Sequence, residues 1–152
     1  MASQKIKQER AALKQYLRRY YIAREAQSTL EDRLRALQAE FRRNPGAGST
    51  ETAGEIERRI SAQAEANKKC LLEIVDMIAL LPDSTERRIL EMRHIDCKSW
   101  REIQETVYLT RTPCYKYYCA GLDSLLSREA VRAVLRPPHF GSGKDKANCG
   151  GL

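Results

Sequence analysis

The chain has 152 residues, of which 31% are charged and 7% aromatic, and its mean hydropathy is −0.58. This balance is too polar for one large spherical core, and it favours long helices with a narrow apolar seam. It contains no run of about eighteen apolar residues, so it predicts no membrane span. Lysine and arginine exceed aspartate and glutamate by 27 to 20, a formal net charge of +7, which favours an anionic partner.

The N-terminal sequence is basic but has no apolar stretch after it, so it does not resemble a secretory signal, and we expect a cytoplasmic protein. The five cysteines form no CxxC pair and are expected to be free thiols in a reducing compartment. His94 and Cys97 have a spacing that zinc could use, but a second pair of ligands is missing. We expect neither a metal nor a cofactor.

The first expected element is one helix of about forty residues, 4–43. Its apolar residues recur in steps of three, four or seven, the spacing of a coiled-coil seam. They are Ile6, Leu13, Leu17, Tyr20, Ala23, Leu30, Leu34, Leu37 and Phe41. The weak stretch between Ala23 and Leu30 predicts a local break in register.

A proline and two glycines then interrupt the pattern in a linker at residues 44–51. A second helix is expected at 52–81, with a seam that contains one polar residue, Asn67, of the kind that fixes register. Two helices joined by a short turn should pack antiparallel. We therefore expect residues 1–81 to form a helical hairpin that also mediates homo-oligomerisation, since a lone two-helix hairpin has little core.

Pro82 ends the second helix, and Asp83 with Glu86 has the spacing of a capping box. Residues 82–135 then show three helical patterns, at 84–95, from a Ser99 cap with Glu102 three residues on, and from a Thr110 cap to about residue 127. Residues 136–152 hold two prolines and four glycines without periodicity, which predicts a disordered tail.

The last two of these helices have the lengths and the three-residue turn of a helix-turn-helix. The expected clamp between them consists of Ile103, Val107, Leu109, Cys114 and Tyr117. The first two turns of the second helix would then present four side chains away from that core, where this motif contacts base edges in the major groove of double-stranded DNA. They are Arg111, Thr112, Tyr115 and Lys116.

The segment LPDSTERRILEMRHIDCKSWREIQETVYLTRTPCYKYYCAGLDSLL resembles region 4 of sigma-70 factors. Over residues 5–126, including ALKQY at 12–16 and NPGAGSTETA at 44–53, the chain is similar to small phage regulators of the RinA and ArpU type. This resemblance implies a regulator of phage late genes that acts in a bacterial host beside RNA polymerase. It places Arg111, Thr112, Tyr115 and Lys116 on the base-reading surface. It also places Ser99, Arg101 and Thr110 at sites that contact the DNA backbone.

Two positions depart from the pattern. Tyr108 occupies the turn position where glycine or asparagine adopts a positive φ, and Gln104 replaces a small alanine between the helices. Trp100 has the spacing of a core residue relative to Ile103 rather than that of a base-stacking one.

Two other functions fit the same pattern. One is a small terminase-like subunit of DNA packaging, although those usually place the DNA-binding domain first. The other is a protein-only coiled-coil adaptor of RNA polymerase. We do not expect an enzyme, because two histidines, His94 and His139, stand without a nucleophile elbow, a phosphate loop or paired carboxylates.

Overall fold

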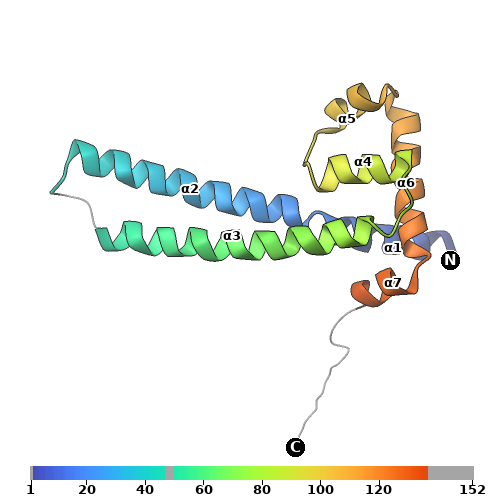
Figure 1. Ribbon diagram of the computed structural model, residues 1–152, viewed down its shortest axis with the longest axis horizontal. Helices are drawn as coiled ribbons and strands as arrows, with labels where there is room; N and C mark the ends of the chain where they lie inside the picture. Colours follow the sequence, from blue (N-terminus) through green and yellow to red (C-terminus); the bar gives the residue numbers. More distant parts are fainter. Residues whose placement is uncertain (1, 47–49, 137–152) are drawn as a thin grey trace, which may run out of the picture.

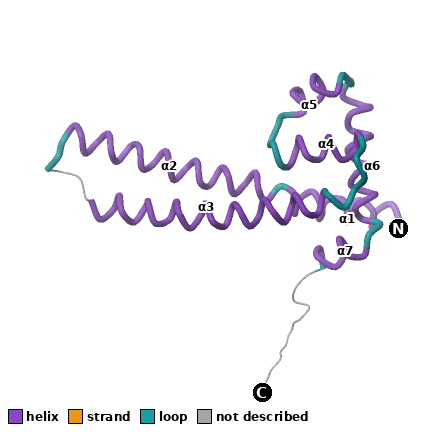
Figure 2. Tube along the Cα trace, in the orientation of Figure 1, coloured by secondary structure: helices purple, strands orange, loops and turns teal. Residues whose placement is uncertain are grey.

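The computed structural model describes residues 2–46 and 50–136, which form helices joined by short loops and contain no strand (Figures 1 and 2). The helices are α1 (Ala2–Leu17), α2 (Arg19–Arg43), α3 (Thr50–Ile78), α4 (Thr85–His94), α5 (Trp100–Val107), α6 (Arg111–Leu126) and α7 (Glu129–Leu135). The predicted all-α class is therefore confirmed. Within this part of the chain, no helix is long and apolar enough to cross a membrane. Part of the predicted linker and the predicted tail after Arg136 lie outside the described residues.

The long N-terminal helix is bent at Arg18, between α1 and α2. Arg18 keeps right-handed helical dihedrals, φ −72° and ψ −10°. Helical hydrogen bonds also continue across the bend, because the Arg18 N–H donates to Lys14 O and the Arg18 carbonyl accepts from the Ile22 N–H. The predicted single helix over 4–43 is therefore divided into two helices at Arg18. The bend follows the buried Leu17 at the end of α1, and α2, which contains no buried residue, begins directly after it. Between Ala23 and Leu30, where a break in coiled-coil register was predicted, α2 is continuous, and that register stays a prediction.

α2 and α3 lie side by side and form a projecting hairpin arm, which we define as α2 with α3 as far as Leu72 (Figure 1). Within its described residues, Asn67 alone is buried. The Asn67 amide donates to Ala23 O at 3.1 Å and to Gln27 Oε1 at 2.8 Å, and its oxygen accepts from Gln63 Nε2 at 2.8 Å. The predicted polar position in the seam is thus a hydrogen-bonded layer that aligns the two helices.

The main core lies at the other end, in a helical cluster formed by α1, the end of α3 from Ile74, the turn that follows it to Leu81, and α4 to α7. Its buried apolar residues are Leu13, Leu17, Ile74, Met77, Ile78, Leu81, Ile89, Leu90, Met92, Ile103, Cys114, Tyr118, Leu122, Leu125 and Val131. The second helix was predicted to reach residue 81, but it ends at Ile78, and the chain turns before Pro82. This core is continuous across Pro82, the position at which the sequence suggested a domain boundary. α7, which helical periodicity did not predict, contributes Val131.

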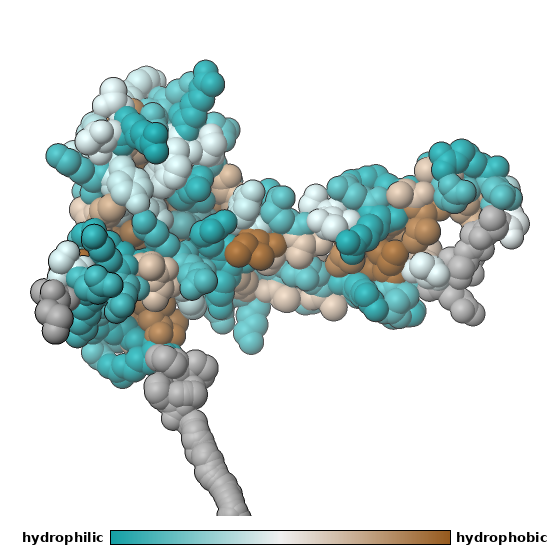
Figure 3. Space-filling view, turned by 180° about the vertical axis from the view of Figure 1, so that it is seen from behind, coloured by the Kyte–Doolittle hydropathy of each residue, from teal (hydrophilic) through white to brown (hydrophobic). Residues whose placement is uncertain are grey.

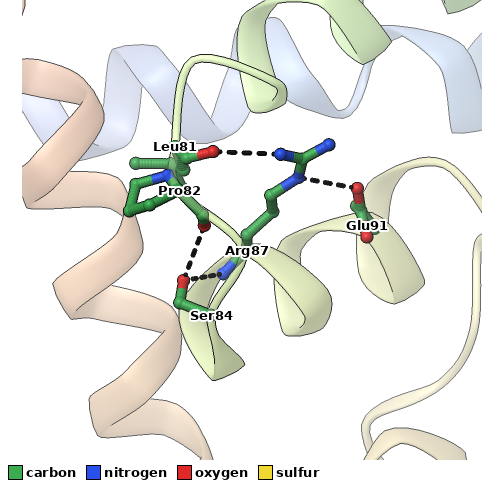
Figure 4. Close-up of polar contacts among 5 residues, drawn as sticks. All are labelled: Leu81, Pro82, Ser84, Arg87 and Glu91. Carbon is green, nitrogen blue, oxygen red and sulfur yellow. Dashed lines mark hydrogen bonds and ion pairs between the residues drawn. The ribbon is translucent and has the colours of Figure 1, made fainter.

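The corner between α3 and α4 is braced by one arginine (Figure 4). The Arg87 guanidinium donates to Leu81 O at 3.1 Å and to Glu91 Oε2 at 3.0 Å. Its backbone N–H donates to the Ser84 hydroxyl oxygen, and that hydroxyl donates to Pro82 O. Ser84 is therefore the N-cap of α4, so the predicted capping box of Asp83 with Glu86 is wrong. The cap lies one residue later because Ser84 has the extended backbone, φ −161° and ψ 168°, that an N-cap requires.

Candidate nucleic-acid interface

α5 is joined to α6 by a tight turn, and both ends of α5 are determined by the local sequence. α5 begins at the predicted capping box, in which Ser99 accepts from the Glu102 N–H and Glu102 Oε1 accepts from the Ser99 N–H at 2.9 Å. The hydrogen bond that the Ser99 N–H donates to the carboxylate is the main reason why the pKa of Glu102 lies below its usual value. α5 ends at Val107, and its C-cap, Tyr108, has φ 57° and ψ 42°, the left-handed conformation that glycine or asparagine usually adopts at this turn position. A side chain there costs roughly 1–2 kcal/mol relative to glycine.

The inner face of α6 packs on α4 and α5 through Cys114, Leu122 and Leu125. Tyr118 completes this face, and the prediction of Tyr117 is wrong, since Tyr117 is 39% exposed and Tyr118 is 3% exposed. The buried Tyr118 hydroxyl has a partner in His94 Nε2 at 2.9 Å, which reduces the cost of burying it.

Gly121 lets α6 approach α4 closely. A Cβ atom added there would lie 2.8 Å from Leu90 Cδ1. The contact between the two helices therefore fixes how far α6 stands from the rest of the cluster.

The outer face of α6 carries three of the four predicted base-reading residues, Arg111, Thr112 and Lys116, and all three are exposed. Among the described residues, no hydrogen bond or ion pair engages their side chains. A shallow groove of about 630 Å³ brings Arg111 together with two predicted backbone-contacting residues, Arg101 and Thr110. Its remaining lining residues are Gln104, Glu105, Tyr108 and Leu109.

The predicted backbone-contacting residues differ in how freely their side chains can be used. The Thr110 hydroxyl makes no capping hydrogen bond, although Thr110 is the N-cap of α6. Arg101 is 89% exposed at its side chain and lies 3.6 Å from Glu105 Oε2. The Ser99 hydroxyl oxygen already accepts a hydrogen bond from the Glu102 N–H. Ser99 also lines a different cavity, together with Arg18 and Arg93.

Tyr115, the fourth predicted base-reading residue, is turned toward α1. Its hydroxyl accepts from Lys14 Nζ at 2.7 Å, and its ring packs edge-on against Trp100 at a centroid distance of 5.8 Å. Farther along α6, Arg10 makes a two-pronged ion pair with Asp123, at 2.7 and 2.6 Å. α1 therefore lies against the same helix that was predicted to contact DNA.

Helical periodicity did not reveal this role for α1, because it gives no information on contacts more than 100 residues apart in the chain. The available signal was charge. α1 has four basic residues, Lys5, Lys7, Arg10 and Lys14, against one acidic residue, Glu9. An excess of this kind on the helix next to α6 extends the positive surface beyond the predicted site residues.

No family model, curated protein or solved structure matches this chain. Within the described ranges, no group of three or more histidine, cysteine or acidic side chains is arranged to hold a metal ion.

Proposed function

We propose that the chain is a sequence-specific DNA-binding transcription regulator, in which α5 and α6 act as a helix-turn-helix and α6 enters the major groove. The resemblance to sigma-70 region 4 and to phage regulators of the RinA and ArpU type extends the proposal to late genes, with host RNA polymerase as a second partner. The observation that carries it is the outer face of α6, where Arg111, Thr112 and Lys116 are exposed and unpaired among the described residues.

These three side chains have the chemistry that base recognition requires. Arginine can pair bidentately with guanine, threonine can contact a thymine methyl group, and lysine can reach a base or a phosphate. Arg101 and Thr110 lie in the same groove as Arg111, where they can contact the phosphates that position a recognition helix. The close packing of α6 on α4 through Gly121 supports this role, because a helix must be held rigidly to read bases.

We also propose that two or more chains associate through the hairpin arm. α2 buries no side chain fully, and the arm exposes Ile22 (55%), Phe41 (40%) and Leu72 (61%). An association that covers these residues would pair two reading helices, as DNA-binding proteins that recognise symmetric sites do.

The experiment is selection of bound fragments from a random DNA pool at two salt concentrations, followed by titration of the selected site. We expect the wild-type chain to select one site with an affinity that falls steeply as salt rises, because phosphate contacts release counterions. Arg111→Ala should weaken binding by about 1–3 kcal/mol and relax the preference at one base pair.

The matched control is Lys69→Ala, which removes an equal charge from an exposed position on α3 in the arm. It should leave the selected sequence unchanged. A pool that shows no enrichment at either salt concentration would instead favour the protein-only adaptor of RNA polymerase. An Arg111→Ala variant with unchanged site preference would remove Arg111 from the reading surface.

A further inference from the structure

A cavity of about 340 Å³ lies at the junction of α1, α4, α5 and α6. Its volume falls at the lower end of the range of about 300–1,000 Å³ that is typical of small-molecule sites. The lining combines basic and aromatic side chains and contains no carboxylate. It consists of Lys14, Arg18, Arg93, His94, Trp100, Tyr115 and Tyr118.

The three cations of this cavity have no anionic partner among the described residues. Lys14 Nζ donates to the Tyr115 hydroxyl, and Arg93 donates to Lys98 O at 3.0 Å. No hydrogen bond or ion pair engages the side chain of Arg18 in the described part of the chain. An adjoining cavity of about 320 Å³ shares Arg18, Arg93 and His94. Its only carboxylate, Glu102, already accepts from Ser99.

His94 is buried beside the three cations of this cavity. The ring is 4% exposed, and burial is the main reason why its pKa falls to about 3. Arg93, Arg18 and Lys14 lower it further, in that order, so all three cations act on the same point. His94 is therefore neutral at physiological pH and does not oppose a bound anion.

Three aromatic rings form the other wall. Trp100 packs edge-on against Tyr118 at a centroid distance of 4.8 Å and against Tyr115 at 5.8 Å. Arg93 lies 5.0 Å from the Trp100 ring centroid, and Lys14 lies 5.3 Å from that of Tyr115. Aromatic and guanidinium surfaces of this kind stack well on nucleobases, and the neighbouring cations suit a phosphate group.

We propose that this cavity binds a nucleotide, with its phosphate between Arg18, Lys14 and Arg93 and its base against Trp100 and Tyr115. The site lies beside the outer face of α6 and does not depend on base reading by Arg111, so it can hold a nucleotide whether or not the proposed DNA-binding function is correct. The nucleotide can be free, or it can belong to a nucleic-acid strand.

Trp100 makes the site directly observable, because it is the only tryptophan in the chain and lines the cavity. We would titrate the full-length protein with adenosine 5′-monophosphate and follow tryptophan fluorescence. The expected result is a saturable change, with adenosine and inorganic phosphate each binding at least about tenfold more weakly than the nucleotide, since each provides only half of the contacts. No saturable change up to about 10 mM nucleotide would overturn the proposal.

Arg18→Gln is the decisive variant. Lys14 and Arg93 have structural contacts, but the side chain of Arg18 is exposed at the bend, so its loss should leave the fold intact. We expect it to weaken nucleotide binding about tenfold, as the loss of one charge-assisted hydrogen bond predicts. Arg88→Gln, at an exposed position on α4 that does not line the cavity, is the matched control and should bind normally.

Equal affinities in Arg18→Gln and the wild type, or phosphate binding as tight as nucleotide binding, would contradict the assignment. Competition with duplex DNA then identifies the source of the ligand. Displacement of the nucleotide assigns the cavity to a nucleic-acid strand, whereas simultaneous binding assigns it to a free nucleotide, and both outcomes support the site. Arg111→Ala should reduce DNA binding but not nucleotide binding, so failure of one proposal is distinguishable from failure of the other.

Discussion

The hairpin arm and the helical cluster are built from helices with similar apolar periodicity, yet they bury their side chains to different extents. The cluster contains every buried apolar residue of the described chain, whereas the arm buries only Asn67. Apolar side chains remain visible along the arm in the space-filling view (Figure 3). A periodic seam therefore predicts a helix, but it does not predict a core, which requires a third element to cover the seam.

The largest expected difference between the two regions is in their response to leucine truncation. Leu122→Ala removes a fully buried side chain from α6 and should reduce the free energy of unfolding by about 2–5 kcal/mol. In the dilute, unassociated chain, Leu72→Ala, at a position that is 61% exposed on α3, should change it by less than about 0.5 kcal/mol. Urea unfolding measures both variants. A loss from Leu72→Ala that grows with protein concentration is the result that the proposed association through the arm predicts. A loss as large as that of Leu122→Ala in the dilute chain would contradict the exposure of Leu72.

Acid should destabilise the cluster through His94. Its pKa is about 3 in the folded chain and about 6.5 when unfolded, so the unfolded state takes up the proton first. The stabilisation that comes from a neutral His94 is fully present above pH 6.5, and it is lost as the pH falls toward 3. At pH 4.5 the loss should reach about 2–3 kcal/mol, at about 1.4 kcal/mol per pH unit.

His94→Gln separates this effect from the titration of the carboxylates. Glutamine can still hydrogen-bond to the Tyr118 hydroxyl but does not titrate. Urea unfolding at pH 7 and pH 4.5 should therefore show a smaller loss in the variant than in the wild type. Parallel losses in the two proteins would show that His94 is protonated in the folded chain.

Asn67→Ala tests the hydrogen-bonded layer of the arm. The change removes the partner of Gln27, Gln63 and the Ala23 carbonyl, and we expect a loss of about 1–2 kcal/mol, since Gln27 and Gln63 remain accessible to water. Hydrogen exchange read by mass spectrometry should show faster exchange in arm peptides and no change in cluster peptides. Gln38→Ala, at an exposed position on α2, is the control. Faster exchange throughout the chain would mean that the two regions unfold as one unit.

The smallest effect is expected from Asp123→Asn, which breaks the ion pair with Arg10 between α1 and α6. The two side chains are 33% and 46% exposed, and such surface pairs contribute no more than about 1 kcal/mol. Thermal unfolding at low and high salt should show a small loss that disappears at high salt. A larger loss at both salt concentrations would mean that this pair, rather than the burial of Leu13 and Leu17, holds α1 on the cluster.

The sequence predicted helices well where local chemistry decides. The capping box of Ser99 and Glu102 is determined by neighbouring residues, and it was predicted. Tyr108 adopts the left-handed conformation of this turn position, although a tyrosine there departs from the helix-turn-helix pattern. Tyr117 and Tyr118 differ by only about 100° around α6, so which of the two is buried depends on the contact with His94. Periodicity cannot predict that His94 lies next to α6. Asp83 and Ser84 are both good N-caps, and the path of the chain after Pro82 selects Ser84.

The candidate site was predictable in part for the same reason. Periodicity placed Arg111, Thr112 and Lys116 on an outer face of α6, where they lie. It also placed Tyr115 there, but Lys14 draws the Tyr115 hydroxyl toward α1. That contact joins residues 101 positions apart in the chain, and pairing over such a distance leaves no local pattern in the sequence.

The bend at Arg18 has a mechanical consequence. The arm meets the cluster through two stiff connections, the single residue between α1 and α2 and the continuous helix α3, which runs from the arm into the cluster. A helix of the length of α2, 25 residues, spans about 37 Å, so a rotation of about 10° at Arg18 displaces the tip of the arm by about 6 Å. Because Arg18 lines the nucleotide cavity proposed above, such a displacement of the arm would also move one wall of that cavity.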